Sequence, residues 1–422
     1  MVRLFYRDRR YLGARDRRVI SETLYGMIRH VRLLEFYAVQ ARQRAGILAG
    51  DPADNVPAEL VYAAYISSKA RPTSESLVEE LLEFWPREMD EGNRRAFVDA
   101  LNAGRDSVEA LENPVKRLSI MYSMPEFIVR EWISCYDVLV TEELCTALNG
   151  QAATTGRVNT LKTDMEECFR QLHSEGVEVE RTLLAPHGLV FRKRLNVSAL
   201  NSFARGWFEL QDEGSQIISL LVDPAPGMTI VDACAGSGGK TLHMAALMKN
   251  QGRIHAFDLG DSRMSRMRER LSRAGVTIVL PCPASDIEGS LGRLKDCADA
   301  VLIDAPCSGT GTFRRNPGAK IALTEEIVQR FAHVQTAILD RYSTLVKPGG
   351  RLVYATCSLL EKENEERVNE FLQAHPRFSI VSPRPLLDRL GISSDPVSEF
   401  LKLSPHRGPT DGFFAAVLMK NP

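Results

Sequence analysis

From about residue 216 onward, short runs rich in β-branched and aliphatic residues alternate with longer stretches of helical periodicity. The runs end in turn at Asp232, Asp258, Leu280, Asp304 and Thr356. Strands that alternate with helices form a mainly parallel sheet with helices packed on its faces. Ligands of such sheets bind at the carboxyl ends of the strands. We therefore predict a Rossmann-like α/β domain over 216–422, with its functional residues at these strand ends.

The clearest helix of this domain is expected over 325–345. Thr324 is placed to cap its start, and Glu325 and Glu326 suit the positive end of a helix dipole. Its apolar residues recur on one face and form a stripe of Ile327, Phe331, Val334, Ile338 and Leu345. This pattern predicts an amphipathic helix.

Composition excludes several classes of protein. No apolar run approaches the roughly 18 residues of a membrane helix, and the arginine-rich start has no apolar core of a secretory signal. The formal net charge of −1 gives no global attraction to nucleic acid, so such a partner would need local basic patches. Eight scattered cysteines form no CxxC pair and no zinc pattern: Cys135, Cys145, Cys168, Cys234, Cys282, Cys297, Cys307 and Cys357. We expect a cytoplasmic protein with reduced thiols, no metal and no membrane partner.

Residues 1–110 are expected to form a separate helical domain. Apolar residues recur there at helical spacing, namely Ile20, Leu24, Met27, Ile28 and Val31. The same stretch is strongly basic, with Arg3, Arg7, Arg9, Arg10, Arg15, Arg17, Arg18, Arg29 and Arg32. A solvated helix surface and a contact with RNA explain these arginines equally well.

The middle segment, 111–215, mixes helical and strand patterns, and we expect a small α+β segment that binds RNA. It carries two basic runs, at 157–162 and at 192–194.

A glycine-rich loop follows the first strand of the α/β domain. The strand at 229–232 leads into Ala-Cys-Ala-Gly-Ser-Gly-Gly-Lys-Thr at 233–241 and then a helix. Such glycines let the backbone approach a ligand closely. A P-loop would need a glycine at Cys234, and a dinucleotide-binding loop would need one at Thr241, so neither motif is complete.

Two aspartates follow the next strands. Asp258 is placed for ribose hydroxyls, and Asp286 could accept a hydrogen bond from an adenine amino group. Ordinary loop carboxylates are the alternative for both.

Two cysteines follow the fourth and fifth strands. Cys307 lies in Asp-Ala-Pro-Cys-Ser-Gly at 304–309, and Cys357 lies in Thr-Cys-Ser at 356–358. A single free cysteine is usually a small buried apolar residue, but two at neighbouring ligand-binding strand ends indicate chemistry.

At these residues the chain resembles the RsmB/NOP/Sun family of RNA cytosine-5 methyltransferases. The resemblance spans most of the chain, and its marks lie at 211–216, 232–241, 304–309, 314–317 with Lys320, 356–358, 363–365 and 410–414. It implies a class I methyltransferase domain over 216–422 with S-adenosylmethionine as cofactor. The cofactor site is expected to comprise Ala235, Gly236, Ser237, Gly238, Gly239, Lys240, Asp258, Arg263, Asp286 and Asp304. Ser237 stands where the family usually has proline, and Gly318 where an aspartate is often found.

The resemblance also implies a division of labour between the two cysteines. Carbon 5 of cytosine is a poor nucleophile, and a thiolate that adds to carbon 6 activates it. The family's nucleophile is Cys357 here, and Cys307 assists release of the product. DNA enzymes use a Pro-Cys nucleophile instead, and the presence of Cys357 decides for RNA. Asp304 is placed to stabilise the protonated base, and Lys240 could contact it.

Residues 10–37 look like the NusB-like helical domain of bacterial members that modify small-subunit ribosomal RNA. Its start looks shortened, and we expect no further RNA-binding domain after residue 420. The expected partner is therefore ribosomal RNA, and the expected oligomeric state is a monomer. A transfer-RNA methyltransferase and a catalytically silent RNA-binding assembly protein are the alternatives.

Overall fold

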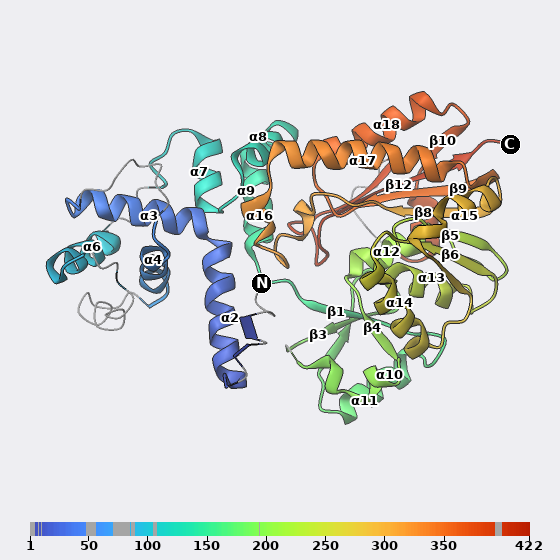
Figure 1. The fold of residues 1–422 in the computed structure, drawn as a ribbon, viewed down its shortest axis with the longest axis horizontal. Helices are drawn as coiled ribbons and strands as arrows, with labels where there is room; N and C mark the ends of the chain where they lie inside the picture. Colours follow the sequence, from blue (N-terminus) through green and yellow to red (C-terminus); the bar gives the residue numbers. More distant parts are fainter. Residues whose placement is uncertain are drawn as a thin grey trace. The chain divides into compact units, whose positions relative to one another are not determined.

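The computed structural model describes residues 5–6, 8–9, 11–47, 56–70, 85, 89–103, 108–193, 195–392 and 399–422 (Figure 1). Four of the arginines noted in the basic runs lie outside the described residues: Arg3, Arg7, Arg10 and Arg194. The chain divides into two compact units. The first, here the helical unit, comprises 1–149 and 316–323, and the second, here the sheet unit, comprises 150–315 and 324–422.

The described part of the helical unit is all α. Its helices are α2 (Ala14–Arg29), α3 (Val31–Arg44), α4 (Ala58–Ala70), α6 (Glu91–Ala103), α7 (Pro114–Met121), α8 (Glu126–Cys135), α9 (Val138–Asn149) and α16 (Ala319–Ala322). Leu34, Ala38 and Phe97 lie in its core, where the Phe97 ring meets Trp85 edge to face.

This unit extends further along the chain than the expected boundary at 110/111. Asn113 caps α7 through its side chain and Pro114 opens the helix. Helix α7 packs against α3, and the Arg32 guanidinium donates to Ser119 Oγ at 3.1 Å. The helices of 114–149 therefore continue the helical unit instead of joining the strands that follow them.

The first part of the sheet unit is a four-stranded antiparallel sheet in the order β2-β3-β1-β4. Its elements are β1 (Thr154–Val158), α10 (Met165–Ser174), β2 (Val179–Arg181), β3 (Gly188–Phe191), η1 (Val197–Ala199), α11 (Asn201–Ala204) and β4 (Phe208–Leu210). Arg157 is buried and donates from Nε to Gln211 Oε1 at 2.8 Å, so this member of the expected basic runs serves the interior.

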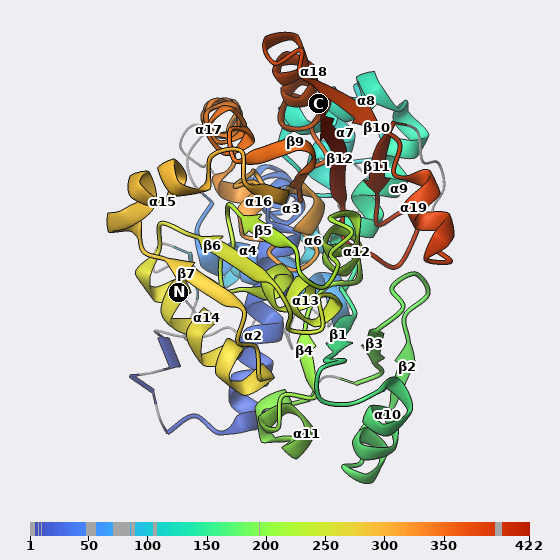
Figure 2. The ribbon, with the colours of Figure 1, turned by 90° about the vertical axis from the view of Figure 1, so that its right-hand side faces the viewer.

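The main sheet has eight strands, in the order β10-β12-β9-β8-β5-β6-β7 with β11 paired to β12. The strands are β5 (Thr229–Asp232), β6 (Arg253–Phe257), β7 (Val279–Cys282), β8 (Ala298–Asp304), β9 (Val346–Thr356), β10 (Phe378–Val381), β11 (Phe400–Leu403) and β12 (Phe413–Lys420). Strands β5 to β9 are parallel, and β10, β11 and β12 pair antiparallel (Figure 2). The predicted Rossmann-like α/β domain is confirmed. Two strand ends differ slightly from expectation, since β6 ends at Phe257 and β7 at Cys282.

Helices cover both faces of this sheet (Figure 1). They are α12 (Glu213–Leu221), α13 (Gly239–Leu247), α14 (Asp261–Ala274), α15 (Ile287–Leu294), α17 (Glu325–Ser343), α18 (Glu365–Ala374) and α19 (Arg384–Arg389). Helices α12, α13 and α14 contribute to one buried apolar cluster, and α15, α17 and α18 to another. Short 3₁₀ helices follow several strands: η2 (Ala284–Asp286), η3 (Thr310–Thr312) and η4 (Glu361–Glu363).

Helix α17 forms where expected, but it buries a different face. Thr324 caps it, accepting from the backbone N–H of Ile327. The buried side chains are Val328, Ala332, Gln335, Leu339, Tyr342 and Ser343. Val334, from the expected stripe, is 45% exposed. The periodicity found the helix but misplaced its buried face, because part of the apolar stripe lines a cavity described below.

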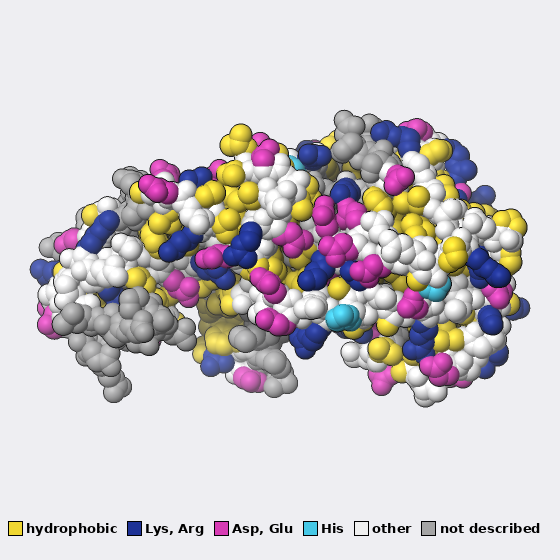
Figure 3. Space-filling model, turned by 90° about the horizontal axis from the view of Figure 1, so that it is seen from above, with side chains coloured by type: hydrophobic (Ala, Val, Ile, Leu, Met, Phe, Trp, Pro, Cys, Tyr) yellow, Lys and Arg dark blue, Asp and Glu magenta, His cyan; other side chains and the backbone are white. Residues whose placement is uncertain are grey.

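Among the described helices, none is long and apolar enough to cross a membrane. On the face drawn in Figure 3, basic and acidic side chains are interspersed. This distribution accords with the net charge of −1.

Candidate active site

The strand order of the main sheet reverses between β5 and β8, which are neighbours, with β6 on one side and β9 on the other. Such a switch point opens a crevice at the carboxyl ends of the strands. Asp232, Asp304 and Thr356 end β5, β8 and β9, and Asp258 directly follows β6. The residues singled out from the sequence thus share one edge of the sheet.

The glycine-rich loop after β5 has a backbone that needs glycine. Gly236 and Gly238 have φ of +57° and +85°, in the left-handed region that glycine adopts without strain. A Cβ on Gly238 would also lie 2.7 Å from Met267 Cγ. Ser237 is held by Arg270, which donates to its carbonyl oxygen at 2.9 Å and its Oγ at 3.1 Å. The serine that replaces the family's proline is therefore fixed by hydrogen bonds.

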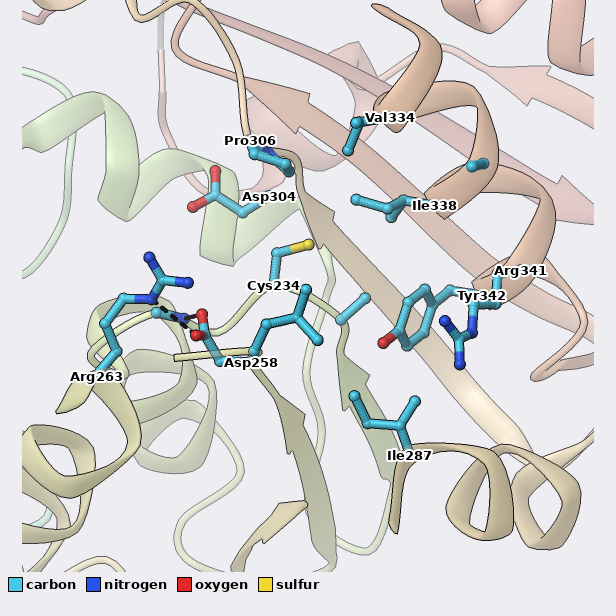
Figure 4. A pocket seen from close by; sticks show the side chains of 14 residues that line it. Cys234, Asp258, Arg263, Ile287, Asp304, Pro306, Val334, Ile338, Arg341 and Tyr342 are labelled. Atoms are coloured by element: carbon cyan, nitrogen blue, oxygen red, sulfur yellow. Dashed lines mark hydrogen bonds and ion pairs between the residues drawn. The ribbon is translucent and has the colours of Figure 1, made fainter. Parts of the chain in front are cut away.

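A cavity of about 460 Å³ lies beside this loop (Figure 4). Its polar lining includes Asp258, Arg263 and Asp304, and its apolar wall includes Ile287, Pro306, Val334, Ile338 and Tyr342. Small-molecule sites typically measure about 300–1,000 Å³ and combine apolar walls with a few polar groups. The cavity therefore suits a ligand with one flat apolar part and one polar part.

Asp258 is the best-anchored carboxylate of this cavity. Its side chain is 7% exposed. It accepts hydrogen bonds from the backbone of Gly236 at 3.0 Å and Gly260 at 2.7 Å, and from Arg263 Nε at 2.7 Å. These donors fix its orientation, and a carboxylate can accept about four hydrogen bonds in all.

The other expected cofactor residues lie at different distances from this cavity. Gly236, Asp258, Arg263 and Asp304 line it. Ala235 and Gly238–Lys240 belong to the adjoining loop and the start of α13. The Asp286 carboxylate accepts from Arg293 at 2.6 Å and Ser290 at 3.0 Å, and the hydrogen bond from Arg293 lowers its pKa. Its neighbour Ile287, and not Asp286, is among the lining residues.

Lys240 and Asp304 form an ion pair, with 2.6 Å between Nζ and Oδ2. Burial opposes the charge on Lys240, but the Asp304 carboxylate outweighs it and raises the lysine pKa. Asp232, 1% exposed, accepts from the Thr241 hydroxyl at 2.7 Å. Burial raises the pKa of Asp232 to about 7.

The two cysteines predicted as a functional pair lie together. The Sγ atoms of Cys307 and Cys357 are 3.4 Å apart, within hydrogen-bonding distance for sulfur. Backbone hydrogen bonds join their loops: Ala305 N donates to Ala355 O, and Gly311 N donates to Cys357 O. The charge of Cys357 also helps to raise the pKa of Lys240. The thiol pair and the lysine–aspartate pair therefore belong to one site.

A charged cluster beside this site was not anticipated as a unit. Arg314 and Arg315 both pair with Asp411, which is 1% exposed. Arg315 also pairs with Asp212 at 2.7 Å between Nη2 and Oδ2. Three sequence marks of the family resemblance that lie far apart along the chain thus meet in one ion-pair network around the buried Asp411.

Lys320 lies in the helical unit and not at this site. Its side chain is buried, and Nζ donates to Arg29 O at 2.9 Å, Tyr122 O at 3.2 Å and Asn149 Oδ1 at 2.6 Å. Arg29 and Asn149 are the last residues of α2 and α9, and Tyr122 caps the end of α7. Lys320 therefore joins three helix ends.

The comparisons with known proteins agree with this architecture. The model of the family described as 16S rRNA methyltransferase RsmB/F matches residues 219–419, and that of the RsmF/B-like ferredoxin-like domain matches 124–198. A probable ribosomal RNA small subunit methyltransferase B of Synechocystis sp. PCC 6803 is 31% identical over 424 residues, which is 97% of this chain and 92% of that protein. The chain belongs to the RsmB/F family of ribosomal RNA methyltransferases.

Two further matches support this membership. A probable methyltransferase of the same name from Bacillus subtilis strain 168 is 35% identical over 322 residues, covering 75% of this chain and 71% of that protein. The crystal structure of PH0851 is 31% identical with a TM-score of 0.74, and the match covers 97% of this chain and 91% of that one. These matches confirm the predicted family and its S-adenosylmethionine cofactor.

Proposed function

We propose that this chain methylates carbon 5 of cytosine in RNA, with small-subunit ribosomal RNA as the substrate, through a covalent adduct at Cys357. The observation that carries the proposal is the pair of thiols 3.4 Å apart at the ends of neighbouring parallel strands, beside the Lys240–Asp304 ion pair. Two thiols and one ion pair supply a nucleophile, a second acid–base group and a fixed charge for a pyrimidine ring.

The cofactor would lie in the cavity at the ends of β5, β6 and β8. Asp258 has acceptor capacity for ribose hydroxyls, and Ile287, Val334 and Ile338 form an apolar wall for a base. The left-handed Gly236 exposes backbone to the ligand, and space for a Cβ there is open. S-adenosylmethionine supplies an electrophilic methyl group on sulfur.

Each side chain then has one step. Cys357 Sγ adds as a thiolate to carbon 6, which makes carbon 5 nucleophilic toward the methyl group. Asp304 stabilises the protonated ring, and Lys240 holds that carboxylate in place. Solvent takes the proton from carbon 5, the electron pair of that bond reforms the double bond between carbons 5 and 6, and Cys357 Sγ leaves as a thiolate. Cys307 assists this release.

Separate substitutions of the cysteines test the proposal. Cys357→Ala should retain cofactor binding but form neither methylated RNA nor a protein–RNA adduct. Cys307→Ala should form the adduct and fail to resolve it, giving a band of reduced mobility on a denaturing gel. Cys297→Ala, at an exposed cysteine, is the matched control and should behave like the wild type.

Two outcomes would contradict the assignment. An adduct lost in Cys307→Ala and trapped in Cys357→Ala would reverse the two roles. Bisulfite sequencing of RNA treated with the wild-type protein and cofactor reads methylation at carbon 5. If carbon 5 stays unmethylated, the proposed activity is wrong.

The proposal includes a role for the other regions. The helical unit, which we take to be NusB-like, and the small antiparallel sheet would bind the RNA backbone, since phosphate contacts position a nucleic acid without reading its sequence. We propose that the protein acts as a monomer in the cytoplasm, without a metal.

A further inference from the structure

A buried carboxylate that the proposed chemistry does not use lies behind the two cysteines. Glu363 ends the short helix η4 and has an exposed fraction of 0%. A buried ionised carboxylate is costly unless hydrogen bonds compensate it. The partners of Glu363 therefore indicate what it is for.

Those partners come from both cysteine-bearing loops. Glu363 Oε1 accepts from the backbone N–H of Ser308 at 2.8 Å, and Oε2 accepts from the Ser308 and Ser358 hydroxyls. Ser308 directly follows Cys307, and Ser358 directly follows Cys357. One carboxylate thus clamps the residues next to both thiols.

A third contact ties this clamp to the helix that lines the cavity. Gln335 of α17 is fully buried, and its Nε2 donates to Glu363 Oε1 at 3.1 Å and to Pro306 O at 2.9 Å. Val334 and Ile338 of the same helix line the cavity. Glu363 is therefore fixed against the helix, and the two loops are fixed against Glu363.

The charges around the two thiols differ in sign. The Lys240 ammonium interacts electrostatically with Cys357. Cys307 faces Cys357 and Glu363, and Tyr354 of β9 lies within electrostatic range of it. The hydrogen bond with Cys357, burial, the charge of Cys357 and then the charge of Glu363 raise the pKa of Cys307. An anion beside one thiol and a cation beside the other favour the thiolate at Cys357.

We propose that Glu363 is a positioning residue that holds the two thiols at contact distance and directs the negative charge of the pair to Cys357. The inference rests on the proposed function, in which Cys357 attacks and Cys307 acts later. Without Glu363, the two loops lose one shared anchor, and Cys307 loses one of the charges that favour its protonated form.

Glu363→Gln tests this inference because it removes the charge and nearly preserves the shape. We expect kcat for methyl transfer to fall at least tenfold, with the KM for RNA and for S-adenosylmethionine within a factor of two of wild type. The matched control is Glu361→Gln, which changes an exposed glutamate of the same short helix and should leave kcat unchanged.

A second readout needs neither RNA nor cofactor. The rate of iodoacetamide alkylation at Cys307, resolved by peptide mass spectrometry, should rise at a lower pH in Glu363→Gln than in wild type. Glu363→Asp keeps the charge and shortens the reach, so it should restore the alkylation profile and not kcat. A purely structural residue would not separate these two properties.

Ser308→Ala covers the case in which Glu363→Gln does not fold. It deletes one anchor and keeps the carboxylate, so kcat should fall while the Cys307 alkylation profile stays as in wild type. Folded Glu363→Gln with wild-type kcat and a wild-type alkylation profile would overturn the inference, as would a wild-type kcat in Ser308→Ala. Failure of the proposed function would look different, because the wild type itself would then form no Cys357 adduct while the alkylation contrast persisted.

Discussion

Two largely buried lysines, one in each unit, show how differently the fold uses the same side chain. Lys240 of the sheet unit meets a carboxylate, with Nζ 2.6 Å from Asp304. Lys320 of the helical unit meets only neutral oxygens among its hydrogen-bond acceptors, at the ends of α2, α7 and α9. The Lys240–Asp304 ion pair lies at a ligand site, whereas Lys320 holds the ends of three helices together.

The pKa values of the two lysines move in opposite directions. The Asp304 carboxylate raises that of Lys240 despite burial. Burial, followed by the positive charge of Arg29, lowers that of Lys320 to about 7. Helix carboxyl ends attract positive charge and work against this fall, but they carry only partial charges. A buried lysine therefore indicates function only when its partner is known.

The largest effect is expected from Lys240→Met, which removes the cation and leaves Asp304 without its ion-pair partner. Methyl transfer to RNA should fall by about 100-fold or more, since loss of one fixed charge at a reacting group commonly costs about 10²–10³ in kcat. Radiolabelled methyl incorporation measures it, with exposed Lys295→Met as the control. A kcat within threefold of wild type would show that Lys240, like Lys320, has a structural role and does not act in methyl transfer.

A smaller effect, on stability, is expected from Lys320→Met. Its loss leaves Asn149 Oδ1 and two carbonyl oxygens without this donor, which should lower the free energy of unfolding of the helical unit by about 1–3 kcal/mol. Hydrogen exchange of the backbone amides of α2 and α9 measures the stability of the helical unit. Lys116→Met, at an exposed position on α7, should change nothing. Equal protection in Lys320→Met and wild type would mean that the three helix ends do not depend on this lysine.

The smallest effect concerns the pH dependence of stability, which we expect for Lys320 and not for Lys240. The unfolded chain keeps Lys320 protonated up to about pH 10.4, whereas the folded chain releases that proton above about pH 7. The unfolded state then binds more protons, so stability rises with pH across this window. The stability that Lys320→Met loses should grow by on the order of 1 kcal/mol between pH 7.5 and 8.5.

Lys240 should show no such trend. Its raised folded pKa contributes stability that is fully present below the unfolded value and is lost only above it. The stability change caused by Lys240→Met should therefore be constant over the same range, measured by urea unfolding at each pH. If the stability change depended on pH with the same slope in Lys320→Met and Lys240→Met, the predicted difference between the two lysines would be wrong.

Local sequence patterns determined the α/β domain and much of its site. Alternating strands and helices imply a parallel sheet, and polar residues at the strand ends imply a ligand edge, because strand direction alone fixes which ends meet. Asp232, Asp304, Cys307 and Cys357 were located in this way. The glycine-rich loop after β5 could also be predicted, because glycine is the residue that adopts a left-handed backbone without strain.

Only the tertiary structure decided which distant residues meet. The 3.4 Å between Cys307 and Cys357 depends on β8 and β9 being neighbours, and no local pattern encodes strand order. Glu363 reads as an ordinary helix-start acid until two loops converge on it. Lys320 follows the Cys307 loop in sequence and yet completes the helical unit, because its amine finds acceptors only where three helices end. Periodicity acts over a few residues, whereas burial and hydrogen-bond pairing are settled by the whole fold.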